Sequence, residues 1–145
     1  MGEFVSKQLI MQALHVLSAF KKPNIVLFHV IEVPSRTATL ETDPYQDEIR
    51  RAKNRLNDLS KWLTGQGLSV QVKVAVARNI ADGIVEETES DGYLIVFLMK
   101  RKAKRGWRRF FARSVSQRVV RSADCLVLTA PLEQLSPRTR APSKH

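Results

Sequence analysis

Residues 24–33, "NIVLFHVIEV", form a nearly continuous apolar run that is rich in β-branched side chains. A run of this kind is typical of a strand that is buried on both faces, as in a parallel sheet. Similar runs follow at residues 93–99, "YLIVFLM", and at residues 125–130, "CLVLTA". These three segments predict the core strands of an α/β domain.

The segments between these runs complete the pattern. Residues 68–77, "LSVQVKVAVA", alternate strictly between apolar and polar, which predicts a strand with one exposed face at or near a sheet edge. Apolar residues at three-to-four spacing predict helices at residues 5–20, 45–65, 79–92 and 114–123. Helices that alternate with strands indicate a three-layer fold, in which a parallel sheet carries helices on both faces through right-handed crossovers.

The helical periodicity also predicts which residues face the core. Asn79 is expected to cap the third helix. The expected inward residues are Ile49, Leu56, Leu59 and Leu63 on the second helix, Ile80, Ile84 and Val85 on the third, and Val115, Val119 and Val120 on the last.

The composition bounds the class of protein. A chain of 145 residues with 43% hydrophobic and 26% charged residues suits one soluble domain. No apolar run approaches the ~20 residues that span a bilayer, and no secretory signal pattern opens the chain. A single cysteine, Cys125, allows no internal disulfide, so we expect a reducing, cytoplasmic setting, and we expect no metal site. The domain is expected at residues 4–131, followed by a disordered basic tail at residues 132–145.

The net charge of +10 comes from one segment, residues 99–121, called here the basic segment. It holds ten of the 24 Lys and Arg residues and no acid, so the rest of the chain has 14 basic against 14 acidic residues. A local positive field of this kind attracts polyanions such as phosphate ligands, nucleic acid or anionic lipid.

The basic segment allows several interpretations. Its charges are explained by a solvated loop, by contact with an anionic membrane, or by nucleic-acid binding. Trp107, Phe110 and Phe111 share one side of a helix, which favours the membrane, although such aromatics also cover cores. No helix-turn-helix or RNA-recognition signature supports nucleic acid. The expected anion or membrane contacts are Lys102, Lys104, Arg105, Trp107, Arg108, Arg109 and Phe110.

Three stretches resemble a known family. "HVIEVP" (29–34), "ARNIADGIVEETESDGYLIVF" (77–97) and "SVSQRVVRSADCLVLTAP" (114–131) are similar to segments of the universal stress protein (UspA-type) domain. The resemblance implies a flavodoxin-like, adenine nucleotide alpha-hydrolase-like fold and a non-enzymatic regulatory or assembly role. "HVIEVPSRT" and "IADGIVEE" also resemble the soluble domains attached to amino-acid permeases and cation antiporters, which implies association with a membrane transporter.

The chain departs from this family at its first strand. The family opens with a strand ending in Asp, central in the order 3-2-1-4-5, but residues 1–4 are too short to form it. Its loss leaves the two neighbouring strands to pair directly, or leaves a gap to be filled by a partner chain. The chain is expected to be a fragment, and the alternative is a genuine four-stranded variant.

The second departure concerns the nucleotide loop. ATP-binding members carry Gly-x-x-Gly, nine residues, then Gly-Ser or Gly-Thr, and here the glycine positions fall on Lys100, Ala103 and Arg113, while Ser114 is retained. The added side chains oppose close backbone approach to phosphate, so no cofactor is expected. The alternative is a sensor that binds ATP, AMP or another anionic ligand through side chains. The residues of this degenerate site are Val30, Lys100, Arg101, Ala103, Arg113 and Ser114.

The resemblance further implies a homodimer that forms through the last strand. The expected interface residues are Cys125, Leu126, Val127, Leu128 and Thr129. Cys125 is expected to be packed and inert, and Ser114 to cap the last helix instead of acting as a nucleophile. The acidic face of the third helix, which includes Asp82, is either solvated or paired with the basic segment.

Overall fold

The computed structural model describes residues 7–33, 35–100 and 109–131, and it has the expected alternation of helices and strands. The elements in chain order are α1 (Lys7–Leu17), β1 (Asn24–Glu32), the short 3-10 helix η1 (Asp43–Tyr45), α2 (Gln46–Gly65), β2 (Ser69–Ala77), α3 (Ile80–Asp91), β3 (Ile95–Lys100), α4 (Arg109–Ser122) and β4 (Leu126–Pro131). The predicted tail at residues 132–145 lies outside the described residues.

The four strands form two separate parallel pairs. β1 pairs with β2 from Asn24 opposite Ser69 onward, and β3 pairs with β4 from Ile95 opposite Leu126 onward. Within the described residues β1 and β3 are not bonded to one another, so the sheet is split in two. Of the two alternatives that the sequence left open, the structure has the gap between the neighbouring strands and not their direct pairing.

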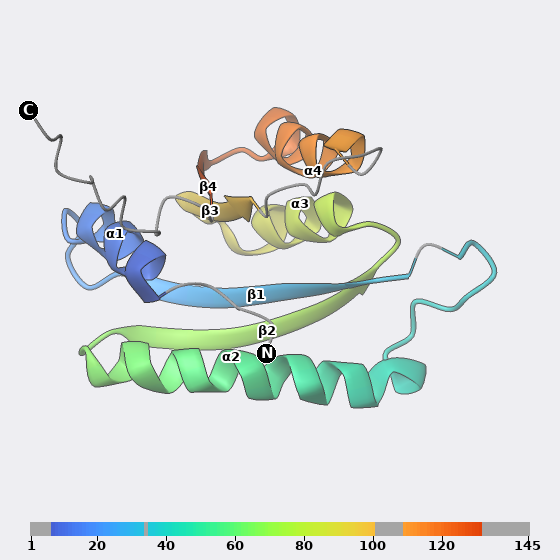
Figure 1. The fold of residues 1–145 in the computed structure, drawn as a ribbon, viewed down its shortest axis with the longest axis horizontal. Coiled ribbons are helices and arrows are strands. Elements are labelled where there is room, and N and C mark those ends of the chain that lie inside the picture. Colours follow the sequence, from blue (N-terminus) through green and yellow to red (C-terminus); the bar gives the residue numbers. More distant parts are fainter. Residues whose placement is uncertain (1–6, 34, 101–108, 132–145) are drawn as a thin grey trace, which may run out of the picture.

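Helices cover both faces of the β1–β2 pair. Figure 1 shows β1 and β2 between α2 on one side and α3 on the other, with α4 lying beyond α3. α2 packs along β2 through a stripe of buried residues at helical spacing, namely Ile49, Ala52, Leu56 and Leu63. The predicted edge position of β2 is confirmed within the described residues, because β1 is its only strand partner there.

α1 is shorter than predicted. The periodicity extends to Phe20, but the helix ends at Leu17 and Phe20 is exposed. The Ser18 hydroxyl donates to the carbonyl of His15, and Lys22 adopts a left-handed conformation (φ 53°) that turns the chain into β1. The tight turn therefore ends the helix before the apolar pattern does.

α3 begins and ends as its sequence predicts, but its buried face differs. The Asn79 side chain accepts a hydrogen bond from the Asp82 amide at 2.8 Å, which confirms the cap, and Gly92 ends the helix in the left-handed conformation (φ 62°). The expectation that Ile80 faces inward is wrong, because Ile80 is exposed while Ala81 and Gly83 are buried. At Gly83 the helix lies so close to Val30 and Ala77 that a side chain would not fit. The other two predicted inward residues, Ile84 and Val85, are half-buried.

α4 starts five residues earlier than predicted. Val119 is completely buried, as expected, but Val120 is exposed, so its predicted inward position is wrong. Ser116 is buried in its place, because residues 116 and 119 are three apart and share one helix face. The start at Arg109 places Ser114 inside the helix, so the predicted role of Ser114 as its N-terminal cap is also wrong.

Candidate functional site

The degenerate nucleotide loop and the predicted membrane contacts lie mostly outside the described residues. The structure describes nothing of residues 101–108. It gives backbone positions for the remaining members of these two groups, with Lys100 at the end of β3 and Arg109, Phe110, Arg113 and Ser114 in α4. In the family pattern the final Gly-Ser opens a helix, whereas here Ser114 lies in the second turn, away from the free amides of a helix N-terminus.

Val30 is the one predicted binding residue whose side chain is described. It is buried on β1 and its two methyl groups face Gly83 of α3. A Cβ added at Gly83 would lie 2.8 and 2.9 Å from these methyl groups and 3.1 Å from the Cβ of Ala77. The Val30 side chain therefore packs α3 against the sheet.

The predicted dimer interface lies on β4 and the residue before it. Among the described residues β4 pairs with β3 alone, so its other backbone edge has no strand partner. Leu126 and Leu128 are 67% and 40% exposed on the same face of the strand, and Thr129 is also exposed. Val127 and Cys125 are half-buried. The structure thus brings an open edge and exposed leucines together on one strand.

Leu94, just before β3, is a further exposed apolar residue, which the sequence pattern did not predict. It is 73% exposed, and its carbonyl accepts a hydrogen bond from the amide of Leu126 at 3.1 Å. It belonged to the predicted apolar run 93–99, but the strand begins one residue later, so the run gave no sign that Leu94 faces solvent.

Cys125 directly precedes β4, and its thiol is protonated at neutral pH. Burial raises the pKa of the Cys125 thiol, and the neighbouring Asp124 carboxylate raises it further. A thiol of raised pKa carries little thiolate and reacts slowly, which fits the expected packed and inert role.

A polar cluster joins β2 to α3. The Lys73 ammonium donates to Glu87 and to Asp91, each at 2.6 Å, and the Tyr93 hydroxyl donates to the same Glu87 oxygen at 2.5 Å. These carboxylates raise the pKa of Lys73 above its ordinary range. Sequence reasoning missed this cluster, although one charged residue within the alternating strand "VQVKVAVA" was a signal for it.

The cluster predicts a loss of stability at high pH. Burial and the hydrogen bond to Glu87 raise the pKa of Tyr93 to about 12, above the value of about 10 in an unfolded chain. The stabilisation is therefore present below about pH 10 and is lost as pH rises toward 12, and the raised pKa of Lys73 acts in the same direction.

Urea unfolding between pH 8 and pH 12 measures this effect. The free energy of unfolding of the wild type should fall more steeply above pH 10 than that of Tyr93→Phe, which has no phenol to ionise. Equal slopes for the two proteins would show that Tyr93 does not contribute.

One residue of the basic segment pairs with the acidic face of α3. The Arg118 guanidinium contacts the Asp82 carboxylate at 2.6 Å and joins α4 to α3. This confirms an ion pair between the acidic face and the basic segment. Because Arg118 is mostly exposed, the pair contributes little to stability.

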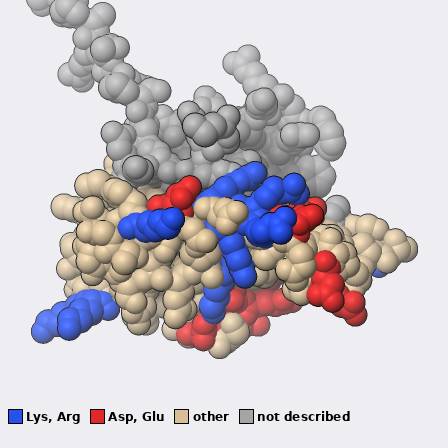
Figure 2. Space-filling model, turned by 90° about the horizontal axis from the view of Figure 1, so that it is seen from below, with Lys and Arg blue, Asp and Glu red and all other residues tan. Residues whose placement is uncertain are grey.

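The exposed face of α2 carries charges of both signs. Figure 2 views the molecule from the α2 side and shows Lys and Arg gathered beside Asp and Glu. The helix itself holds five basic residues, Arg50, Arg51, Lys53, Arg55 and Lys61, and three acidic ones, Asp47, Glu48 and Asp58. A mixed surface of this kind suits solvation better than the capture of a polyanion.

In residues 7–33, 35–100 and 109–131, no three His, Cys, Asp or Glu side chains gather closely enough to hold a metal ion. No helix in those ranges has the length and apolar character to cross a membrane.

Comparison with known proteins identifies the family. The model of the universal stress protein family matches residues 5–131, which include every described helix and strand. Searches among curated proteins and among solved structures found no match. Parallel strands alternating with helices, as in a flavodoxin-like fold, agree with this match. The chain therefore belongs to the universal stress protein family.

Proposed function

We propose that the chain is a non-enzymatic regulatory or assembly module that works as a homodimer in the cytoplasm, beside a membrane transporter for amino acids or ions. Membership of the universal stress protein family supports a regulatory role in the stress response. The replacement of three loop glycines by Lys100, Ala103 and Arg113 supports a role without nucleotide chemistry. The resemblance of "HVIEVPSRT" and "IADGIVEE" to transporter-attached domains supports the association with a transporter.

The open edge of β4 is the observation that carries this proposal. A strand edge with free backbone groups and exposed leucines is a ready surface for pairing with another chain. When two copies meet antiparallel about a twofold axis, each edge supplies the hydrogen-bond partners of the other. Leu126 and Leu128, which are exposed on the same strand, would then be covered by the second copy.

The double substitution Leu126→Lys with Leu128→Lys is expected to make the protein monomeric. Four lysines would meet across the twofold axis, and like charges at an interface oppose association. The dissociation constant of the dimer, measured by analytical ultracentrifugation, should rise at least about tenfold.

Val120→Lys is the matched control, because Val120 is an exposed valine on α4 outside the strand edge. Its dissociation constant should remain that of the wild type. A wild-type protein that is monomeric at all concentrations, or equal weakening by both variants, would contradict dimerisation through β4.

ATP and AMP, with magnesium, are expected not to bind. The reason is that Lys100 and Arg113 place long side chains where the family pattern needs close backbone approach to phosphate. Native mass spectrometry of the purified protein should show no carried nucleotide, and calorimetric titration should show no binding heat. Stoichiometric binding that Arg113→Glu abolishes would instead establish the sensor alternative.

The same titration, made with vesicles of anionic lipid, tests whether the basic segment binds a membrane. Binding to these vesicles but not to neutral ones, lost on changing Arg108, Arg109 and Arg113 to Glu, would place the module at the membrane surface. Binding to neither nucleotide nor lipid leaves a protein partner as the ligand of the module.

A further inference from the structure

The loop between β1 and α2 carries a short exposed turn that is rich in hydroxyl groups. Residues 35–42, "SRTATLET", contain four Ser or Thr residues. In Figure 1 this loop leaves β1 and returns to α2 at the right-hand end of the sheet. The amide of Ala38 donates to the carbonyl of Ser35 at 3.3 Å, which closes a β-turn. Ser35, Arg36 and Thr37 are all exposed on this turn.

The turn is anchored on both sides. Before it, the amide of Val33 donates to the carbonyl of Ala77 at 2.8 Å and so extends the contact of β1 with β2. After it, the Tyr45 hydroxyl donates to the carbonyl of Thr39 at 3.1 Å, and Ala38 packs against the buried cluster that includes Val33. These anchors give the exposed turn one defined position at the end of the sheet.

Arg78, the first residue after β2, brings a positive charge to the turn. Its side chain is half-buried, and its guanidinium donates to the carbonyl of Ser35. A guanidinium carries several N–H donors, so this one bond leaves others available. Neither Arg78 nor Arg36 forms an ion pair with any residue that the structure describes.

The Ser35 hydroxyl lies close to this charge. It belongs to the same residue as the carbonyl oxygen that accepts from Arg78, and covalent geometry keeps the two oxygens within a few ångströms of each other. Its oxygen is 3.0 Å from that of the Thr37 hydroxyl, which is also exposed. In the described part of the chain, an accessible hydroxyl and an arginine without a carboxylate partner therefore meet at one turn.

We propose that Ser35 is a phosphorylation site and that Arg78 receives the phosphoryl group. A phosphoryl group carries a charge of about −1.5 to −2 near pH 7 together with strong acceptor oxygens, which match the available donors of the guanidinium. Arg36, the next residue, adds a second positive charge. Glu32 and Glu41, the nearest acids along the chain, are exposed, so water and salt weaken their repulsion.

The modification is a phosphoryl transfer from a nucleoside triphosphate held by a separate protein kinase. The Ser35 Oγ attacks the terminal phosphorus, the new O–P bond forms as the bond to the nucleoside diphosphate breaks, and the hydroxyl proton passes to a base of the kinase. An exposed turn offers a free phosphate ion little contact, whereas a covalent link holds the group beside Arg78. The site therefore suits an attached phosphoryl group better than a free anion.

Phosphorylation would tie the β1–α2 loop to the junction between β2 and α3. Arg78 directly precedes Asn79, the N-terminal cap of α3, so a bond from phosphate to Arg78 joins the loop to the start of this helix. The site is independent of the proposed dimer, because it uses the ends of β1 and β2 and no residue of β4. Failure of either proposal leaves the other standing.

Phosphopeptide mapping of the protein from its own cells is the first test. Full-length protein isolated from growing and from stressed cells should carry phosphate on Ser35 in a fraction of the molecules, identified by mass spectrometry with site-determining fragments. Absence of phosphate from Ser35 in both preparations would overturn the proposal, and so would phosphate confined to other residues.

Full-length protein with phosphoserine in place of Ser35 tests the role of Arg78. A nearby guanidinium stabilises the dianion, so the second pKa of this phosphoserine, measured by phosphorus NMR, should lie at least about 0.5 below its ordinary value of about 6. Arg78→Gln should return the pKa to that value. Arg121→Gln, which removes an exposed arginine of α4, should leave the pKa lowered. Equal pKa values in the presence and absence of Arg78 would contradict its role as the receiving group.

Inorganic phosphate distinguishes a modification site from a site for a free anion. The unmodified protein, titrated with phosphate in a calorimeter, should bind it no more tightly than a Kd of about 1 mM. Saturable binding below about 1 mM that Arg78→Gln abolishes would make the turn a site for a free anion, and this result would overturn the assignment of Ser35 as a phosphoryl acceptor.

Discussion

Replacing Gly83 by valine is expected to cost about 3 kcal/mol of the free energy of unfolding, at the upper end of what overpacking a core costs. Even the first added carbon would lie 2.8 to 3.1 Å from Val30 and Ala77, closer than packed carbons approach. Val30 is β-branched and has little rotamer freedom with which to move aside. α3 would have to lift away from β1 and β2. Urea unfolding followed by circular dichroism measures the loss.

Two variants show whether the contact with Val30 is the cause. Glu86→Val introduces the same residue at an exposed position of the same helix and should cost well under 1 kcal/mol. Gly83→Ala should also lower the free energy of unfolding, because its Cβ meets the Val30 methyl groups. In the double variant with Val30→Ala these methyl groups are gone, so the two losses should sum to less than expected, and a double-mutant cycle measures the difference as a coupling energy. Strictly additive effects, or equal losses for Gly83→Val and Glu86→Val, would contradict close packing at this position.

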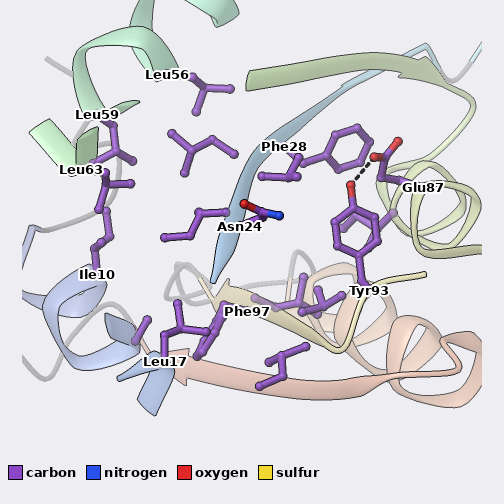
Figure 3. Close-up of a pocket in the computed structure, with 18 of the residues that line it drawn as sticks. Ile10, Leu17, Asn24, Phe28, Leu56, Leu59, Leu63, Glu87, Tyr93 and Phe97 are labelled. Atoms are coloured by element: carbon purple, nitrogen blue, oxygen red, sulfur yellow. Dashed lines mark hydrogen bonds between the residues drawn. The ribbon is translucent and has the colours of Figure 1, made fainter. Parts of the chain in front are cut away.

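Leu63→Ala is expected to cost about 2–5 kcal/mol, the range measured when a buried leucine is truncated. Leu63 is 1% exposed, on the last turn of α2, and it is one of the two large side chains that are fully buried among the described residues. Leu63 lines an apolar groove between β1 and β3 (Figure 3). Its truncation would enlarge this groove, because the two sheets are separate there and few neighbouring side chains can move in to fill the space. Unfolding in urea, followed by the fluorescence of Trp62 one residue away, measures the change.

The same helix supplies graded controls for this prediction. Leu59 is half-buried and also lines the groove, so Leu59→Ala should cost less than Leu63→Ala. Lys61 is exposed, and Lys61→Ala should change the free energy of unfolding by less than about 0.5 kcal/mol. Equal losses at positions 63 and 61 would show that the end of α2 does not contribute to the core.

The order of the elements could be predicted from residues alone because hydrophobic periodicity is a local property. The run 24–33 predicted β1, the alternation of 68–77 predicted an edge strand, and Asn79 marked the start of α3. The same periodicity failed for Ile80 and Val120. Which face of a helix is buried depends on how closely the helix approaches its neighbours, and this distance is not encoded in spacing.

The candidate sites divide in the same way. The strand edge of β4 was proposed from the family resemblance together with an apolar run near the end of the domain. The exposure of Leu94 could not be predicted in this way, because only the folded chain shows that β3 begins after it. In the cluster around Lys73, the packing of α3 on β2 brings Glu87 and Asp91 to a lysine that lies 14 and 18 positions before them. A short sequence motif therefore could not predict the cluster. The loop residues 101–108 lie outside the described residues, and their predicted roles stay predictions.

The hydrophobic pattern was enough to predict the alternating helices and strands of an α/β fold, and the sequence itself places ten positive charges in one segment, because those properties depend on residue identity and local spacing. The family came instead from the resemblance of particular stretches, which the match over residues 5–131 confirms. The sequence left open whether the two strands beside the missing position pair directly or stand apart. The three-dimensional arrangement resolved this in favour of two separate sheets with an apolar groove between them. The physical reason is that strand pairing is a long-range contact: a run of residues predicts that a strand is buried, but only its spatial neighbours determine which of its edges is filled.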